Sequence, residues 1–459
     1  MPGQTWYIDP QSGNDANPGS SPDRPLRTYA DRPFAPGDSV LFKRGGVIRD
    51  ALRTREGSSD GFITYGAYGQ GPKPRFLGSV AADDPDRWVK ERPSIWRYKG
   101  TFTSEVCNLV FNDGQSCGHL RWQIDDLKHQ GEWFYTALGA GADSAYQRKG
   151  QSAAPRCEDG VLYLYSQSNP ARFYNSIECS LWGQRRLADG RRYVILQDLE
   201  FRNSGVHAYQ DVRVDHVTIR RCDFRCIGGA VWSRQRRIRF GNAVEFWDGA
   251  VDCLVEDCVF HDIYDAGVTH QGGDTSGVPE RVYFRNNLFV HCGIAPYECR
   301  GPAARDIYFE NNTCIHAGGD LSMQGEPSPR QSEIYPQPMG HHVFIWRLDW
   351  PDQMGPIYIR NNIFHEAPHG AAVYSVASPE YERHFVIDHN DYCQTTGNML
   401  FLLGGKTYRP SDWSAYQKET GQDAHSLLAD PQFVNPQTGD YRLKPTSPCL
   451  TMGRRTNHE

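Results

Sequence analysis

Three acidic residues and a histidine stand at comparable places in successive stretches near the middle of the chain. These stretches read Asn242-Ala-Val-Glu-Phe-Trp-Asp248, Asp265-Ala-Gly-Val-Thr-His-Gln271 and Ala295-Pro-Tyr-Glu-Cys-Arg300. Aligned with one another, they bring Glu245, Thr269 or His270, and Glu298 to about the same position. Two carboxyl groups that face one site can act as a general acid and as a base or nucleophile. We therefore predict that Glu245, Glu298 and Asp265 are catalytic.

The distance between two carboxyl groups decides which chemistry they can share. Strands stacked in one sheet lie about 4.8 Å apart, so Glu245 and Glu298, two strands apart, would stand on the order of 9 to 10 Å from each other if both pointed outward. That separation leaves room for a water molecule between an acid and a base. Carboxylates on adjacent strands, about 5 Å apart, suit a nucleophile instead, and Asp265 with either glutamate is the candidate for that closer pair.

Two further residues are predicted to support the carboxylates. In the alignment His270 falls between them, where an imidazole can orient a carboxylate or change its pKa. Asp248 precedes Gly249, a turn position at which an aspartate commonly binds backbone amides. A purely structural role stays open for both residues.

A repeat frames these residues. Between about 190 and 400 a degenerate motif recurs, and its clearest copies are Val282-Tyr-Phe-Arg-Asn-Asn-Leu-Phe289, Ile307-Tyr-Phe-Glu-Asn-Asn-Thr-Cys314 and Ile357-Tyr-Ile-Arg-Asn-Asn-Ile-Phe364. Most copies follow one another after roughly 25 residues, which suits one coil of a β-solenoid. Apolar residues alternate within each copy, as expected of a short strand with one buried face.

One position of the repeat is occupied by asparagine in the later copies. It holds Asn287, Asn312, Asn362 and Asn390, and cysteine in two earlier copies. An asparagine at a bend tolerates the left-handed backbone conformation and can bond its neighbour in the next coil. Stacked identical side chains are typical of an all-β parallel β-helix, in which each coil lies over the last. A β-sandwich or propeller is the alternative, which the unequal intervals disfavour.

Composition excludes some classes of protein. A chain of 459 residues exceeds the usual size of one globular core, so it must form several domains or a solenoid. Its 39% hydrophobic content and net charge of -6 indicate a soluble, folded protein. Without clustered Lys and Arg, a nucleic-acid partner is not expected. An odd count of 13 cysteines indicates buried thiols rather than a disulfide framework.

Neither a membrane partner nor an export signal is expected from this sequence. It contains no run of 18 apolar residues, and its first residues lack the charged and apolar regions of a signal peptide. The location stays open between the cytoplasm and a secreted or periplasmic protein trimmed of its signal.

Both ends of the chain contain stretches shared with a known group of proteins. They include Trp6-Tyr-Ile-Asp-Pro10, Pro36-Gly-Asp-Ser-Val-Leu-Phe42 and Asp430-Pro-Gln-Phe433. These stretches resemble the entry and exit segments of carbohydrate-active enzymes on the pectate-lyase-like right-handed parallel β-helix, including glycoside hydrolase-like members. The resemblance implies that fold and a polysaccharide or oligosaccharide substrate. The superfamily includes hydrolases, lyases and epimerases, so the resemblance implies no single reaction.

The resemblance and the repeat together suggest four parts. Residues 1–100 are expected to form an N-terminal cap and the first coils, and residues 101–188, whose aromatic stretches lack the repeat, a β-rich insert. Residues 189–404 would form the main coils with the site, and residues 405–459 a C-terminal cap.

For a carbohydrate substrate, the paired carboxylates favour glycoside hydrolysis, which needs one acid and one base or nucleophile. A polysaccharide lyase or uronate epimerase is the alternative, because Arg300, His270 and Tyr297 could neutralise a uronate and abstract its proton. Such a lyase could also use Ca²⁺, but the set contains no lysine and no compact group of aspartates. A non-catalytic carbohydrate-binding β-helix is the third possibility.

Aromatic rings with a polar edge suit the face of a sugar, and an arginine beside them can clamp a carboxylate. The residues predicted on these grounds to bind substrate are Trp232, Trp247, Tyr297, Arg300, Trp346 and Arg347. No metal site is predicted, since His341-His342 lacks a spaced carboxylate, and a hydrolase needs no cofactor. The sequence leaves the sugar, its linkage and the oligomeric state open.

Overall fold

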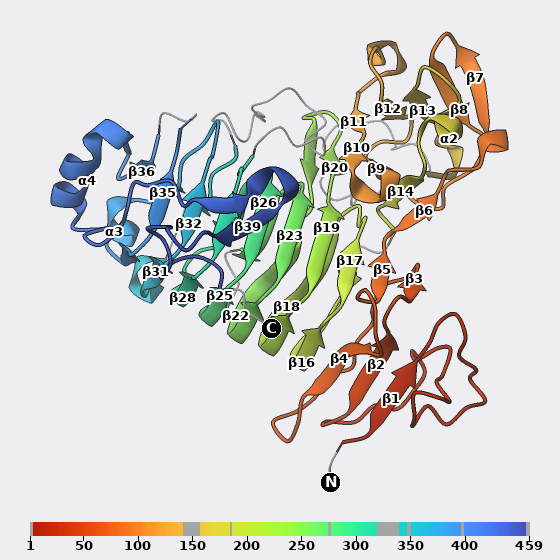
Figure 1. The fold of residues 1–459 in the computed structure, drawn as a ribbon, viewed down its shortest axis with the longest axis horizontal. Helices are drawn as coiled ribbons and strands as arrows, with labels where there is room; N and C mark the ends of the chain where they lie inside the picture. Colours follow the sequence, from red (N-terminus) through yellow and green to blue (C-terminus); the bar gives the residue numbers. More distant parts are fainter. Residues whose placement is uncertain are drawn as a thin grey trace.

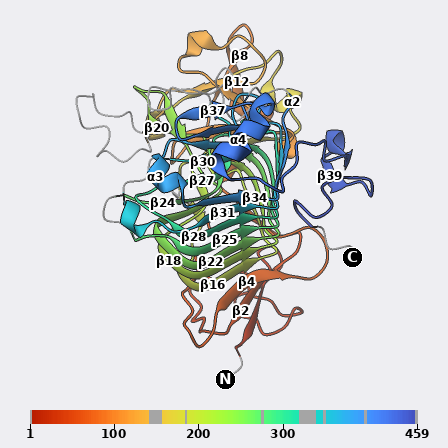
Figure 2. The same ribbon diagram turned by 90° about the vertical axis from the view of Figure 1, so that its left-hand side faces the viewer.

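Short parallel strands, stacked coil upon coil, make up most of the chain (Figure 1). The computed structural model describes residues 3–140, 157–183, 186–273, 277–318, 339–346, 350–395 and 399–455. A regular coil contributes one strand to each of three parallel sheets, and Figure 2 shows the strands of successive coils lying over one another. The predicted right-handed parallel β-helix is confirmed.

The three sheets follow one another around each coil. The first contains β1 (Thr5–Ile8), β2 (Ser39–Lys43), β4 (Ile63–Tyr68), β16 (Arg192–Gln197), the second parts of β18 (His207–Arg220) and β22 (Val244–Glu256), β25 (Glu280–Arg285), β28 (Arg305–Glu310), β31 (Ile357–Arg360) and β34 (Phe385–Asp388). The second contains β3 (Val47–Ile48), β5 (Arg75–Leu77), β17 (Glu200–Arg202), β19 (Asp223–Ile227), β23 (Val259–Ile263), β26 (Leu288–Cys292), β29 (Thr313–Ile315), β32 (Ile363–His365) and β35 (Asp391–Cys393). The third contains β15 (Arg186–Ala188), the first parts of β18 and β22, β24 (Ala266–Gln271), β27 (Ala295–Cys299), β30 (Val343–Ile345), β33 (Val373–Ser375), β36 (Phe401–Leu403) and the antiparallel β37 (Lys406–Tyr408).

Side chains of one kind stack inside the coils. Phe201, Phe224, Phe260 and Phe289 follow one another with ring centroids 5.4, 4.9 and 4.6 Å apart. Each of these rings is fully buried, which contributes about 1.5 to 3 kcal/mol per side chain. The stack fixes the register of one coil on the next, because a shift by one residue would turn every ring outward.

The asparagines form the predicted ladder at the bend between the first and second sheets. Asn312 Oδ1 accepts a hydrogen bond from the Asn287 N–H at 3.0 Å, and Asn362 Oδ1 accepts one from the Asn312 N–H at 2.9 Å. The left-handed conformation belongs to the residue before each of these, with φ of 55° at Asn311 and 57° at Asn361. The expectation that the stacked asparagine itself adopts it is wrong, since its side chain must turn inward to reach the next coil.

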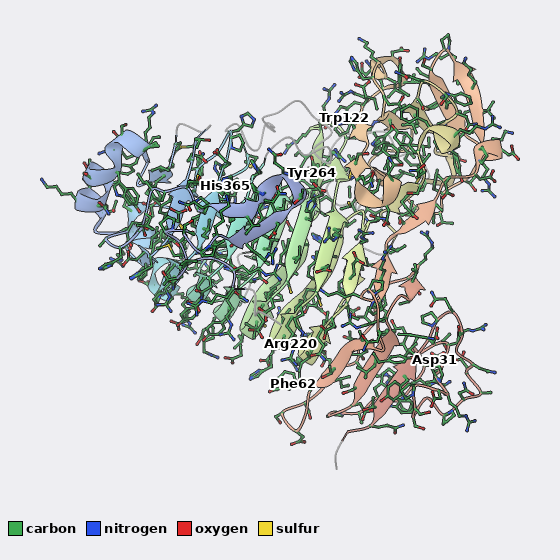
Figure 3. The ribbon with its side chains drawn as sticks, viewed as in Figure 1. Asp31, Phe62, Trp122, Arg220, Tyr264 and His365 are labelled. Carbon is green, nitrogen blue, oxygen red and sulfur yellow. The ribbon has the colours of Figure 1, made fainter. Side chains whose placement is uncertain are left out.

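Two further sheets lie beside the first coils and have a separate core around the buried Trp133. One contains β6 (Ser79–Ala81), β9 (Val106–Phe111), β10 (Ser116–Cys117) and β14 (Ile177–Leu181), and the other β7 (Trp88–Arg92), β8 (Ile95–Tyr98), β11 (His119–Leu120), β12 (Glu132–Tyr135) and β13 (Leu162–Tyr165). These insert strands begin before residue 101, because β6 pairs with β14 across the base of the insert. A hairpin of β20 (Ala230–Ser233) and β21 (Ile238–Phe240) places Val231 in the same core. In Figure 3, Trp122 of the insert and Tyr264 of the solenoid mark where the two parts adjoin.

The last residues divide between two places. The helix α4 (Trp413–Thr420) covers the far end of the solenoid, where Tyr416 stacks on Phe401 at 4.0 Å (Figure 1). The chain then turns back, and β38 (Phe433–Asn435) and β39 (Asp440–Leu443) lie against the outer side of the second sheet, with Phe433 packed near Ile363. Only the first part of the expected cap therefore closes the end.

The cysteines are free thiols, and all except Cys157 are buried, as predicted for most of them. No helix in the described part of the chain is long and apolar enough to cross a membrane.

Candidate active site

The outer side of the third sheet carries the two glutamates in one row. In the pairing of β22 with β24, Glu245 is opposite Thr269, and in the pairing of β24 with β27, Thr269 is opposite Glu298. The predicted alignment is confirmed, and it selects Thr269 rather than His270 as the residue between them. In the flanking coils the same row continues to Gln210 and Phe344.

Strand alternation gives these residues their direction. Val244 and Phe246 on either side of Glu245, and Tyr297 and Cys299 on either side of Glu298, belong to the core of the solenoid. The glutamates consequently point outward. With one strand between them, their backbone positions lie about 9 to 10 Å apart.

Amide groups hold the carboxylate of Glu245 in place. The Gln210 side chain donates to Oε1 at 2.6 Å, and the Asn242 side chain donates to Oε2 at 2.5 Å. His207 Nδ1 lies 3.3 Å from the same Oε2. Glu245 is only 3% exposed although it points outward. Both of its oxygens are thus fixed before any substrate binds, which suits a catalytic carboxylate.

Gln210, Asn242 and His207 were not among the residues predicted from the sequence. The register offers a signal for Gln210, since it occupies in β18 the row position that Glu245 occupies in β22. Asn242 lies at the turn before β22, and its Oδ1 also accepts a hydrogen bond from the Ala266 N–H at 2.9 Å. Asn242 therefore links the Glu245 carboxylate to the backbone of the next coil by hydrogen bonds.

Glu298 is bound from the neighbouring coil as well. The Gln271 side chain donates to Glu298 Oε2 at 3.1 Å, and Glu298 is 1% exposed. Beyond Glu298 along β27, the guanidinium of Arg300 lies 5.4 Å from the centroid of the Trp346 ring. Arg300 and Trp346 thus meet beside this glutamate, as two residues predicted to bind substrate.

Aromatic side chains flank the carboxylate row at both ends. On the Glu245 side, the ring centroid of Phe240 in the hairpin lies 5.6 Å from that of His207 and 5.3 Å from that of Trp182. On the Glu298 side, Phe344 packs against Trp346 at 5.2 Å and Tyr374 at 5.8 Å. Phe344 and Tyr374 are buried. Phe240, Trp182 and Trp346 are partly exposed and offer apolar faces for sugar rings on either side of the carboxylates.

The predicted roles of His270 and Tyr297 in the site are wrong, because strand alternation turns both side chains inward. His270 points into the solenoid, where its Nε2 lies 2.9 Å from the hydroxyl of Tyr297, and burial lowers its pKa to about 3. Tyr297 is fully buried and stacks on Phe309 at 5.2 Å. His270 does not lie between the carboxylates, and Tyr297 cannot stack on a sugar. A difference of one position moves a side chain to the other face.

Asp265 lies at the turn before β24, where its Oδ2 accepts a hydrogen bond from the Gly241 N–H at 2.9 Å. It precedes Thr269 by four residues, or roughly 13 Å along a strand. Asp265 therefore lies outside the row of Glu245 and Glu298, and its closer pairing with either glutamate stays a prediction. An aspartate that binds the backbone at a turn fits this position.

The remaining candidates are spread around the row. Trp247 points outward from β22 and is 37% exposed, and Trp232 on β20 is half-buried. Asp248 accepts a hydrogen bond from Arg213 at 3.0 Å and lines a cavity of about 280 Å³ at the bend toward the first sheet. Arg347 lies outside the described residues.

Groups of histidine and aspartate with the spacing of metal ligands occur elsewhere in the described chain. They are His261 with Asp262 and His291, Asp215 with His216 and Asp252, and Asp388 with His389 and His425. None of these groups belongs to the carboxylate row.

Comparison with known proteins adds evidence about the fold. Neither the models of protein families nor the curated proteins gave a match. Among solved structures, the chain is similar to the complex of XylC with xylose, with 9% identity over 88% of this chain and 73% of that chain and a TM-score of 0.50. It is also similar to a structure named as a glycoside hydrolase (11% identity, 92% and 99% of the two chains, TM-score 0.48) and to one of a rhamnogalacturonan lyase (11%, 99% and 97%, TM-score 0.36).

At these identities the likeness concerns the fold alone. The structural neighbours are β-helix carbohydrate-active enzymes, which is the group that the ends of the sequence resemble.

Proposed function

We propose that the protein is a glycoside hydrolase in which Glu245 and Glu298 form the acid–base pair. The observation that carries this proposal is their shared row on the outer side of the third sheet, with one strand between them. Their backbone positions lie about 9 to 10 Å apart. Carboxyl groups at this distance would stand at the upper end of the range for enzymes that invert the anomeric configuration, in which a water molecule fits between the two groups.

The hydrogen bonds and neighbours of the two glutamates support a division of the two roles between them. Both oxygens of Glu245 accept hydrogen bonds from side-chain amides, and such donors favour a carboxylate that accepts a proton from water. Glu245 is therefore the base. Glu298 is the acid that protonates the leaving oxygen, beside the ring of Trp346 and the guanidinium of Arg300.

The flanking aromatic residues support a carbohydrate substrate. The half-buried Phe240 at one end of the row and Trp346 at the other, together with the exposed Trp247, provide rings on which sugars can stack. XylC, whose structure has this fold, was solved in complex with xylose. We infer that the chain binds an oligosaccharide or polysaccharide along the row.

The lyase or epimerase alternative loses support from the same geometry. It relies on His270 or Tyr297 to abstract a proton, and both side chains face the core. Of the predicted residues that the structure describes, Arg300 remains beside Glu298 to neutralise a uronate. The non-catalytic alternative does not explain why two carboxylates are buried and hydrogen-bonded at one row position.

A product assay tests the proposal. Wild type, Glu245→Gln and Glu298→Gln would be incubated with neutral and uronic polysaccharides, and both new reducing ends and the ultraviolet absorbance of unsaturated products would be followed. We expect reducing ends without absorbance from the wild type, and a loss of at least 100-fold in each variant. The control is Glu256→Gln, on the same strand β22 but paired with Arg285 on the first sheet, which should keep full activity. An absorbing product that both variants still form would refute the hydrolase.

A further inference from the structure

A row of histidines follows the outer edge of the second sheet, away from the carboxylate row. It consists of His261, His291, His316 and His365, whose ring centroids lie 5.5, 6.0 and 5.5 Å apart from one coil to the next. Figure 3 places the last of them, His365, beside the strands of the C-terminal segment. The row runs from the end of β23 to the end of β32.

At the beginning of this row, Asp262 lies between two imidazoles. Its Oδ2 is 2.8 Å from His261 Nδ1, and its Oδ1 is 3.3 Å from His291 Nδ1. The ligand atoms of the three residues all lie within 4.8 Å of one another. The side chain of Asp262 is 14% exposed, and those of the histidines are 35% and 34% exposed. The carboxylate is therefore shielded, while the rings border the solvent.

We propose that His261, Asp262 and His291 bind a divalent transition-metal ion, with Zn²⁺ as the first choice. Two imidazole nitrogens and one carboxylate oxygen are ligands that Zn²⁺ accepts at about 2.0 to 2.2 Å. Ligand atoms of a tetrahedral site then lie roughly 3.4 Å apart. This value is close to the 2.8 and 3.3 Å between the Asp262 oxygens and the Nδ1 atoms of His261 and His291. Without the ion, the Nδ1–H groups of the two rings face the Asp262 carboxylate. When the ion binds at Nδ1, each neutral ring exchanges this proton with solvent and carries it on Nε2 instead, so no net proton is lost. Solvent supplies the fourth ligand.

Burial distinguishes this group from its nearest counterpart. In the group of Asp388, His389 and His425, both Nδ1 atoms also lie near one carboxylate oxygen, at 3.2 and 2.8 Å. The side chains of these histidines are 53% and 66% exposed, however, and that of Asp388 is 27% exposed. This second group is less shielded from water, so it is a poorer site for an ion.

The third group is also a poorer site. Asp252 beside His216 is held by the guanidinium of Arg281 at 2.6 and 2.9 Å. A cation there would be repelled by the arginine. Among the described residues, the group around Asp262 is therefore the best candidate.

The ion would connect two coils, because His261 and Asp262 belong to β23 and His291 to β26. A metal that binds ligands from separate strands binds the folded chain better than the unfolded one, so it should raise the unfolding temperature. This inference does not depend on the proposed hydrolase.

The test uses the full chain, freed of metal with a chelator and then titrated with ZnCl₂ by calorimetry at pH 7.5. We expect one ion per chain and a higher unfolding temperature with Zn²⁺ present. Asp262→Asn and His291→Ala should each weaken the affinity at least tenfold, whereas the matched variant His425→Ala should keep it. Binding that survives both substitutions, or is lost in His425→Ala, would overturn the proposal.

A spectroscopic measurement on the wild type covers the case in which a variant does not fold. Co²⁺ in a four-coordinate site absorbs visible light far more strongly than the hydrated ion, and adding one equivalent of Zn²⁺ should abolish this band. A wild-type chain that shows no such band and no stoichiometric uptake of Zn²⁺ would refute the site without any variant.

Discussion

Glu245 and Glu298 face Thr269 from its two sides, each as its partner in the parallel third sheet. The spacing between the backbones of the two glutamates is thus set by the repeat of the solenoid and not by a flexible loop. Since one strand lies between them, this spacing is about twice the strand spacing of 4.8 Å.

The separation predicts the stereochemical outcome. A water molecule between the two carboxyl groups attacks the face of the sugar opposite to the leaving oxygen, so the product should have the inverted anomeric configuration. Proton NMR of the first product formed, recorded before mutarotation, measures this directly. A retained configuration would require a closer carboxylate than Glu298 and would exclude the pair.

The amide of Gln210 should matter for catalysis although it touches no reacting atom. It donates to Glu245 Oε1 at 2.6 Å, and without it the carboxylate loses a charge-assisted hydrogen bond worth about 1.5 to 3 kcal/mol. We expect Gln210→Ala to lower kcat about tenfold or more and to leave KM nearly unchanged.

The control for this prediction is Gln197→Ala, because Gln197 binds Arg220 on the first sheet. This variant should behave as the wild type. Equal kcat values for Gln210→Ala and the wild type would show that Glu245 needs no positioning by Gln210.

Tyr297 and His270 should affect stability and not catalysis. The Tyr297 hydroxyl lies 2.9 Å from His270 Nε2 inside the core, so Tyr297→Phe removes one buried hydrogen bond and should cost about 1 to 3 kcal/mol of unfolding free energy. Its activity on a polysaccharide should stay within about twofold of wild type at a temperature where both are folded. A large loss of kcat with unchanged stability would show that Tyr297 takes part in catalysis and would contradict this prediction.

These two residues show where prediction from the sequence reached its limit. The period of the strands and the position of each coil were readable, so the row of Glu245 and Glu298 could be predicted. The alternation of inward and outward side chains depends on the turn before each strand, and an error of one residue there exchanges Thr269 with His270. Asp265 lies at the turn before β24, where its Oδ2 accepts a hydrogen bond from Gly241, and its catalytic role stays a prediction.

Residues that act through long-range contacts were harder to find. Gln210 and His207 belong to a coil whose copy of the repeat is weak. That Gln210 lies beside Glu245 follows only from the pairing register of β18 with β22. The insert was expected to begin at residue 101, but its strand β6 pairs with β14 nearly a hundred residues later. Antiparallel pairing over such a distance leaves no periodic signal in the sequence.

The asparagine ladder should stabilise the fold. Asn312 Oδ1 accepts a hydrogen bond from the Asn287 N–H, and its Nδ2 donates to the Phe284 carbonyl at 2.9 Å. Asn312→Ala leaves these buried groups unsatisfied, at about 1 to 3 kcal/mol each, and should lower the unfolding temperature by several degrees in a thermal scan.

Its neighbour provides a matched control for the ladder. Asn311 has a φ of 55°, a conformation that glycine adopts without strain. Asn311→Gly should therefore change the unfolding temperature little. A drop in Asn311→Gly as large as that in Asn312→Ala would mean that the bend, and not the ladder, holds the coils together.

Asp391 should make stability depend on pH. Burial raises the pKa of its carboxyl to about 7, and its Oδ1 accepts a hydrogen bond from the Ala429 N–H at 3.1 Å. An unfolded aspartate titrates near pH 3.9, so between about pH 4 and 7 the folded chain holds a proton that the unfolded chain has released. Stability must therefore fall as pH rises through this window, by up to about 4 kcal/mol, and be level above it.

Asp391→Asn keeps the shape and the acceptor but cannot ionise. Compared with the wild type in urea denaturation, it should be similar near pH 4 and more stable at pH 8, and a wild-type advantage at pH 8 would show that the ionised carboxylate is stabilised by the fold.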